Sequence, residues 1–267
     1  MPSDGGGGHR TAIVLVAHGS RDPRGAAATR ALARAAGAAR PDWEVHGSYL
    51  DHSLPRPVQV LGALEAAGHT RAVLAPLLLT AAYHGRVDVP AEVAAARAGG
   101  VRIDVAIADV LGPVDGRVDP LLLDGLCRRL DEAVAAEVLA GGDDRPLDGV
   151  VLAAAGTRNG SARGTVGRAA AALGARLGVP CTVAYASAAP PAAGAAVARL
   201  RAAGATRVGL AAYFLAPGLL YDVTVGSARE AGAVAAAAPL GDAPELVRLL
   251  QSRVESATVE PAPAYAA

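Results

Sequence analysis

His18, Asp51 and His84 each stand at or just beyond the end of an apolar run that is typical of a buried β-strand. In an open parallel sheet, ligands bind in the crevice beyond the carboxyl ends of the strands, so we expect these side chains to converge on one edge. Two neutral imidazoles and one carboxylate form a nitrogen and oxygen donor set that suits first-row divalent ions such as iron, cobalt, nickel or zinc. The sequence therefore predicts a metal site built from three loops.

Two segments of the first half of the chain recur in the second half with nearly constant spacing. Residues 68–71, Gly-His-Thr-Arg before an apolar run, return as residues 204–207, Gly-Ala-Thr-Arg before an apolar run, an offset of 136. Residues 14–21, which end in His-Gly-Ser-Arg, return as residues 151–158, which end in Ala-Gly-Thr-Arg, an offset of 137. The spacing predicts two diverged copies of one structural unit.

All histidines are confined to the first copy: His9, His18, His46, His52, His69 and His84. Random drift in an alanine-rich chain is one explanation. The positions of the histidines favour a single functional site instead, because imidazole is the commonest neutral ligand and proton carrier near physiological pH. The repeat aligns the candidate ligands with residues that lack their chemistry: His18 with Ala155, Asp51 with Ser187, and His84 with Leu220.

Short apolar runs alternate with Ala-, Leu- and Arg-rich stretches of helical period, which predicts βαβ units and a parallel sheet in each copy. We expect strands at Thr11–Ala17, 43–50, 72–79, 102–108, Gly149–Ala154, 182–186 and 207–214. We expect helices at Pro23–Ala39, 56–67, 90–98, Pro120–Leu139, 161–177 and 245–253. The predicted fold class is α/β, with two similar open parallel-sheet domains.

A polar, turn-rich stretch at residues 141–147 predicts a linker between the domains. The N-terminal α/β domain is expected at residues 11–140 and carries the metal site, and the C-terminal degenerate repeat is expected at residues 149–255. Residues 1–10 are rich in glycine and residues 256–267 in alanine and proline, so both ends are expected to be disordered.

Composition narrows the classes of function. The 25 basic and 25 acidic residues balance, every basic residue is arginine, and no basic stripe is interleaved with aromatic residues, which argues against nucleic-acid binding. An anionic substrate would therefore be held by arginine forks. No run approaches the roughly 18 apolar residues that span a bilayer, and no signal segment is apparent. We expect a cytoplasmic monomer without a membrane partner, and we interpret Cys127 and Cys181 as buried thiols outside any metal motif.

Two motifs resemble a known family. Residues 18–22 read His-Gly-Ser-Arg-Asp, and residues 77–90 read Leu-Leu-Leu-Thr-Ala-Ala-Tyr-His-Gly-Arg-Val-Asp-Val-Pro. Together they resemble the sirohydrochlorin chelatases, the class II chelatases of sirohaem and cobalamin synthesis. The second motif is long and specific, and the similarity extends over residues 11–135 and, as a faded copy, over residues 149–253. This resemblance to the long two-domain form implies paired α/β domains that face each other across a tetrapyrrole-binding cleft.

The resemblance implies that His18 and His84 are the catalytic, metal-binding histidines. The family commonly has a glutamate near the end of the second strand, where this chain has Asp51, which is one methylene shorter. The neighbouring His52 is the alternative third metal contact. The residues expected to bind the carboxylates or the macrocycle of the substrate are Ser20, Arg21, Tyr83 and Arg86, with Arg158 as the repeat equivalent of Arg21.

Metal insertion into a tetrapyrrole requires the loss of two pyrrole N–H protons while the ion sheds its waters, and a neutral imidazole can hold the ion or accept a proton. We therefore expect a lyase that takes Fe²⁺, Co²⁺ or Ni²⁺ as substrate and has no permanently bound cofactor. Which histidine performs which step stays open. One alternative is a non-catalytic metal or tetrapyrrole carrier. The other is a histidine-dependent phosphatase, although such enzymes usually have Arg-His-Gly, and here Ala17 precedes His18.

Overall fold

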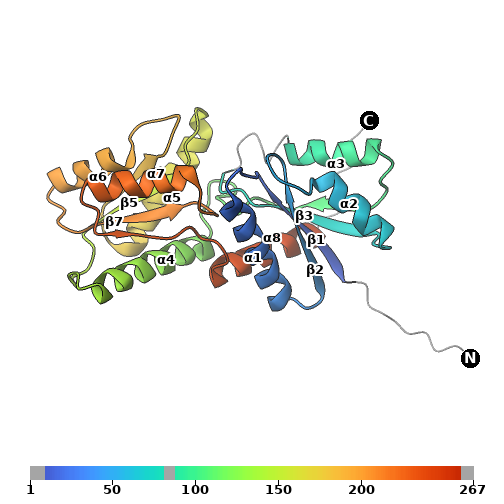
Figure 1. The fold of residues 1–267 in the computed structure, drawn as a ribbon, viewed down its shortest axis with the longest axis horizontal. Helices are drawn as coiled ribbons and strands as arrows, with labels where there is room; N and C mark the ends of the chain where they lie inside the picture. Colours follow the sequence, from blue (N-terminus) through green and yellow to red (C-terminus); the bar gives the residue numbers. More distant parts are fainter. Residues whose placement is uncertain (1–9, 81–87, 260–267) are drawn as a thin grey trace, which may run out of the picture.

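The structure of the protein, a computed structural model, describes residues 10–80 and 88–259 (Figure 1). The first half of the chain forms a four-stranded parallel sheet with helices on both faces. Its elements are β1 (Thr11–Ala17), α1 (Pro23–Ala39), β2 (Trp43–Tyr49), α2 (Pro57–Ala66), β3 (Arg71–Pro76), α3 (Val89–Ala98), β4 (Asp104–Ile107) and α4 (Pro120–Leu139).

The central strand β1 is apolar without alternation because it is covered on both faces. Consecutive side chains of a strand point to opposite sides of the sheet. Ile13 and Leu15 belong to the core that includes α1, whereas Val14 and Val16 belong to the core that includes α2 and α3. All four side chains are fully buried. The apolar run at residues 13–16 therefore encodes a strand in the middle of a layered sheet.

The second half repeats this arrangement. Its elements are β5 (Gly149–Ala154), α5 (Gly160–Leu177), β6 (Cys181–Tyr185), α6 (Ala193–Ala202), β7 (Val208–Tyr213), α7 (Leu219–Glu230), β8 (Ala235–Ala236) and α8 (Pro244–Val259). The strand order is β2-β1-β3-β4 in the first sheet and β6-β5-β7-β8 in the second, and all paired strands in both sheets are parallel. The identical topology confirms the predicted α/β fold of two similar parallel-sheet units.

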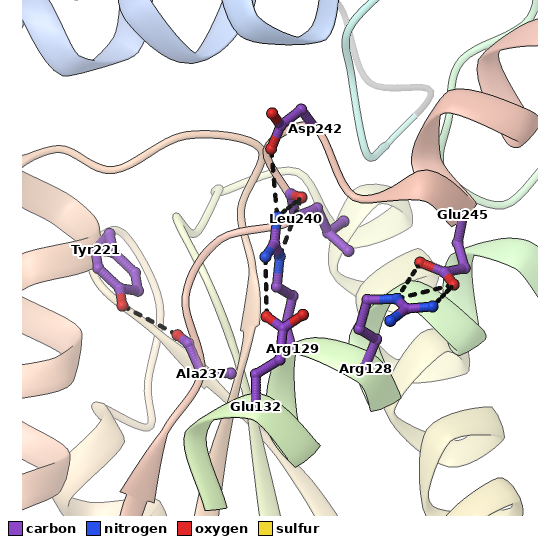
Figure 2. A network of polar contacts seen from close by, with 8 residues as sticks. All are labelled: Arg128, Arg129, Glu132, Tyr221, Ala237, Leu240, Asp242 and Glu245. Carbon is purple, nitrogen blue, oxygen red and sulfur yellow. Dashed lines mark hydrogen bonds and ion pairs between the residues drawn. The ribbon is translucent and has the colours of Figure 1, made fainter. Parts of the chain in front are cut away.

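The last helix of each half packs against the other half. α4 lies against β7 and β8, whereas α8 lies against β3 and α1, as Figure 1 shows. In Figure 2, Arg128 of α4 reaches Glu245 near the start of α8, with its Nη2 atom 2.6 Å from Oε1. Arg129, also on α4, donates to the carbonyl oxygen of Leu240 at 3.0 Å. Because one buried core contains side chains from both sheets, the two halves form a continuous hydrophobic interior.

The structure differs from the predicted elements at several places. β3 ends at Pro76, earlier than expected, because the amide of Leu78 donates to the carbonyl oxygen of Pro76 at 2.9 Å and turns the chain out of the sheet. α8 continues to Val259, into the tail expected to be disordered. The apolar periodicity does not predict α6 or α7. The structure contains both helices, at positions where the repeat requires them. No helix in the described ranges is long and apolar enough to cross a membrane.

Candidate functional site

His18 and Asp51 lie side by side at the carboxyl edge of the first sheet. β1 and β2 are neighbouring parallel strands, with Ala17 paired to Tyr49, so the loops that follow them start at the same level. The amide nitrogen of Asp51 donates to the carbonyl oxygen of His18 at 2.8 Å. His18 is exposed at this edge, where its ring can meet a ligand. The structure thus brings two of the three predicted metal ligands together.

A glycine is required between these loops. Gly19 has φ +95°, and a Cβ atom there would lie 1.7 Å from the carbonyl oxygen of Asp51. In the second half, Gly156 has φ +97°, and its Cβ atom would lie 1.9 Å from the carbonyl oxygen of Ser187. The amide of Ser187 likewise donates to Ala155, at 3.1 Å. The main chain of the site is therefore preserved in both halves, while its ligand side chains are present only in the first.

His52 makes two contacts with the Asp51 carboxylate. Its φ is +58°, its amide donates to Asp51 Oδ1 at 2.8 Å, and its Nε2 atom lies 3.5 Å from Oδ2. The His18 and His52 rings meet edge to face, with centroids 6.5 Å apart. The hydrogen bond from the His52 amide, together with the fields of His52 and His18, lowers the pKa of Asp51. Asp51 is therefore an ionised carboxylate at neutral pH, as a metal ligand must be.

The third predicted ligand, His84, lies outside the described residues, as do Tyr83 and Arg86. Within residues 10–80 and 88–259, no three His, Cys, Asp or Glu side chains are arranged to hold a metal ion. The described part of the chain accordingly supplies His18, Asp51 and His52 as neighbours. The assignment of a complete ligand set stays a prediction.

His18 also lines a cavity of about 350 Å³ between the two halves. The first half contributes residues that follow β1, Tyr49 at the end of β2 and Leu77 after β3. The second half contributes the continuous segment 214–221, which runs from the end of β7 into α7. Most lining side chains are apolar, and Leu219 and Leu220 at the start of α7 are partly solvent-exposed. The lining of the cavity therefore combines the apolar segment 214–221 with His18.

The segment 214–221 was missed as part of the site because its side chains carry no catalytic chemistry. The repeat register contained the signal. At the offset of 136 that relates the third strands of the two halves, residues 214–221 correspond to residues 78–85, the segment that includes His84. Applying the register to the apolar positions as well as to the ligands would have placed this wall at the cleft.

Of the described polar residues predicted to bind substrate, Ser20 alone is among those that line this cavity. Ser20 lines it, and its Oγ atom accepts a hydrogen bond from the Asp22 amide at 3.0 Å, which stabilises the turn into α1. Arg21 and Arg158 are exposed. None of the described residues that line the cavity is an arginine. The carboxylate-binding roles of Arg21 and Arg86 stay predictions.

One arginine joins the two halves near this cavity. Arg24, in the first turn of α1, contacts both Asp22 and Asp222 of α7, with Nη2 to Oδ2 distances of 2.6 and 2.5 Å. These hydrogen bonds raise the pKa of Arg24 and lower that of Asp22. Because Gly25 and Tyr221, the neighbours in sequence of Arg24 and Asp222, line the cavity, the ion pair lies close to it.

The fold and the site define an α/β protein with duplicated parallel-sheet units and a histidine at the cleft between them. The family profile CbiX matches residues 12–133 and again residues 149–257, so the chain belongs to the CbiX family. The two matched ranges correspond to the two halves of the structure. No curated protein matches the chain.

Solved structures share this fold over nearly the whole chain. A structure of SirB from Bacillus subtilis with Fe³⁺ has a TM-score of 0.76 at 19% identity and covers 93% of this chain and 95% of its own. The sirohydrochlorin chelatase SirB from Bacillus subtilis subspecies spizizenii in complex with cobalt has a TM-score of 0.72 at 18% identity, covering 94% and 97%. CbiX, described as the terminal enzyme for biosynthesis of sirohaem in denitrifying bacteria, has a TM-score of 0.62 at 21% identity, covering 93% and 99%.

Proposed function

We propose that this chain is a sirohydrochlorin chelatase, a lyase that inserts Fe²⁺ or Co²⁺ into sirohydrochlorin in sirohaem or cobalamin biosynthesis. The observation that carries the proposal is the position of His18 on the wall of an apolar cavity between the halves, hydrogen-bonded through its main chain to the ionised Asp51. Membership of the CbiX family supports it, as do the iron and cobalt named for the two SirB structures.

The chemistry of the residues agrees with this reaction. An apolar wall at residues 214–221 suits one face of a flat macrocycle, and His18 opposite it can hold the incoming metal or accept a pyrrole proton. The Asp51 carboxylate supplies negative charge that stabilises either a divalent ion or a protonated imidazole. The resemblance assigns the second histidine role to His84. We propose Ser20, Arg21, Tyr83 and Arg86 as substrate contacts, because the substrate is a polycarboxylate and these residues lie close in sequence to His18 and His84. The metal is a substrate in this scheme, and no resident cofactor is required.

The proposed enzyme acts as a monomer, because each chain contains both walls of the cavity. Its proposed location is the cytoplasm. Cys127 and Cys181 are both free thiols, as is usual in a reducing compartment. Burial raises the pKa of the Cys181 thiol to about 12, so this thiol is protonated at neutral pH. Sedimentation velocity of the purified chain, across a range of concentrations, tests the monomer.

The experiment that tests the function is an anaerobic absorbance time course of sirohydrochlorin with the purified protein and Fe²⁺, Co²⁺ or Ni²⁺ in turn. Each metal needs a parallel reaction without protein, because metals also insert spontaneously. Spectral conversion over many turnovers, faster than this control, supports a chelatase and ranks its metals. Conversion that stops after one equivalent of protein indicates a carrier, and conversion at the control rate contradicts the proposal.

A further inference from the structure

The hydroxyl group of Tyr213 forms a hydrogen bond between the two halves of the chain. Tyr213 is the last residue of β7, and its side chain is 3% exposed. Its Oη atom donates to the carbonyl oxygen of Leu79 at 2.9 Å. Leu79 follows β3 of the first half, two residues after Leu77, which lines the cavity beside His18. A side chain of the second half therefore holds the segment that leaves the first sheet at the site.

The rest of this segment is held by main-chain contacts of the first half. The amide of Leu77 donates to Val16 at 2.9 Å, and the carbonyl oxygen of Leu78 accepts from the amides of Leu111 and Gly112. Gly112 lies so close that a Cβ atom there would be 1.9 Å from the carbonyl oxygen of Leu79. The Leu79 peptide is thus packed against Gly112, and the Tyr213 hydroxyl is the side-chain donor that orients its carbonyl group.

This contact has no counterpart in the repeat. Val16 of β1 pairs with Pro76, and Ala153 of β5 pairs with Ala212, so Leu77 is the first-half equivalent of Tyr213. Leucine has no donor, and the hydrogen bond therefore runs in one direction only, from the second half to the first. Burial raises the pKa of Tyr213, so the hydroxyl stays protonated and donates throughout the usable pH range.

We propose that Tyr213 is a positioning residue, which orients the Leu79 peptide and thereby fixes the segment 77–79, whose Leu77 lines the cavity together with His18. The inference rests on the proposed chelatase function for its effect on turnover, although its effect on the Leu79 segment is independent of that function. The hydrogen bond from Tyr213 also gives the second half, which has no histidine, a structural role in the site of the first half. In the sequence, the same segment continues toward His84.

The test compares Tyr213→Phe with wild type and with Tyr185→Phe, all in the full-length chain. Phenylalanine keeps the buried ring and removes only the donor. Tyr185, at the end of β6, is a matched control, because it is similarly buried at 5% exposure and its strand pairs with β5, not with β7, which carries Tyr213. Far-UV circular dichroism verifies that both variants fold.

The first measurement is hydrogen–deuterium exchange of peptides that contain residues 77–80, without substrate. Loss of one buried hydrogen bond should accelerate exchange there by about five- to tenfold in Tyr213→Phe. Tyr185→Phe should exchange like wild type in these peptides. Unchanged exchange in Tyr213→Phe would overturn the inference, whatever the activity of the protein.

The second measurement is steady-state turnover with sirohydrochlorin and the preferred metal. We expect kcat of Tyr213→Phe to fall about tenfold while KM for the tetrapyrrole changes less than about twofold, because misplacement of a wall affects reacting geometry more than binding. A rise in KM alone, or an equal loss in Tyr185→Phe, contradicts a positioning role. If wild type shows no turnover but exchange rises in Tyr213→Phe, the chelatase proposal fails while the orientation of Leu79 by Tyr213 stands.

Discussion

The amide of Asp51 donates to the carbonyl oxygen of His18 at 2.8 Å, so the main chain holds these two candidate ligands at a constant separation. Gly19 makes this approach feasible, because any Cβ atom there would overlap the carbonyl group of Asp51. The second half retains the same arrangement at Gly156 and Ser187. The repeat has thus kept the loop geometry in both halves and the candidate ligand side chains in one.

Gly19→Ala should destabilise the protein more than Gly68→Ala. The two glycines have nearly equal φ values, +95° and +93°, but a Cβ atom at Gly68 meets nothing within 4 Å. The left-handed conformation costs alanine about 1 kcal/mol at either position, and overlap with Asp51 adds about 1–3 kcal/mol at Gly19. Urea unfolding, followed by the fluorescence of Trp43, measures both losses. Equal losses in the free energy of unfolding would show that the loops of Gly19 and Asp51 move apart without a free-energy cost.

His18→Ala should lower turnover by at least about 100-fold, because an imidazole that holds metal or accepts a proton is removed. Its stability should change little, since the side chain is exposed. His46→Ala is the control, because His46 lies on β2 and pairs with Glu44, with Nε2 2.8 Å from Oε1. Anaerobic assays on both variants check this prediction. Full activity of folded His18→Ala would remove His18 from the site.

Asp51→Asn should lose part of its activity, about tenfold in kcat/KM for the metal, whereas Asp51→Glu should retain most of it. Glutamate keeps the charge and matches the residue that the family commonly has here. Because the pKa of Asp51 is lowered, the carboxylate stays ionised down to below about pH 4, and it should not cause an activity change near neutral pH. Steady-state kinetics of both variants, with the metal concentration varied, measures these changes.

Asp222→Asn and Arg24→Gln should change the KM for sirohydrochlorin in opposite directions. Asp222 and the carboxylates of the substrate would compete for Arg24, which directly precedes the cavity-lining Gly25. Asp222→Asn frees Arg24 and should lower KM by up to about fivefold, because an exposed ion pair contributes at most about 1 kcal/mol. Arg24→Gln removes the guanidinium group and should raise KM. The difference should shrink in high salt. Shifts in the same direction for both variants would mean that Arg24 does not bind substrate.

Glu245 should make stability depend on pH through its pairing with Arg128. The Arg128 guanidinium lowers the pKa of the buried Glu245 carboxyl in the folded state. Its stabilisation is therefore fully present above the unfolded pKa of about 4.3 and is lost as pH falls through the lower folded value. Glu245→Gln should be less stable at neutral pH and should approach wild type at about pH 3. Denaturant unfolding at several pH values, with the exposed Glu255→Gln as control, measures this change.

The strands and most helices could be predicted because they depend on local patterns. The apolar run at residues 13–16 indicates a strand covered on both faces. Asp22 followed by Pro23 is a typical start for a helix, and the Asp22 side chain does accept the Arg24 amide, at 2.9 Å. The end of β3 could not be predicted in this way, since the apolar residues 77–79 continue the pattern after the chain has left the sheet.

The sequence by itself determined the repeat, the α/β class and the placement of His18 and Asp51 after two predicted strands, because strand and loop positions follow from periodicity and register. Only the tertiary structure decided that α4 and α8 pack across the halves, that residues 214–221 form the second wall of the cavity, and that Tyr213 reaches Leu79. These contacts join segments that are far apart in the chain. Their side chains are selected by shape and hydrogen bonding in three dimensions, and no local pattern records that selection.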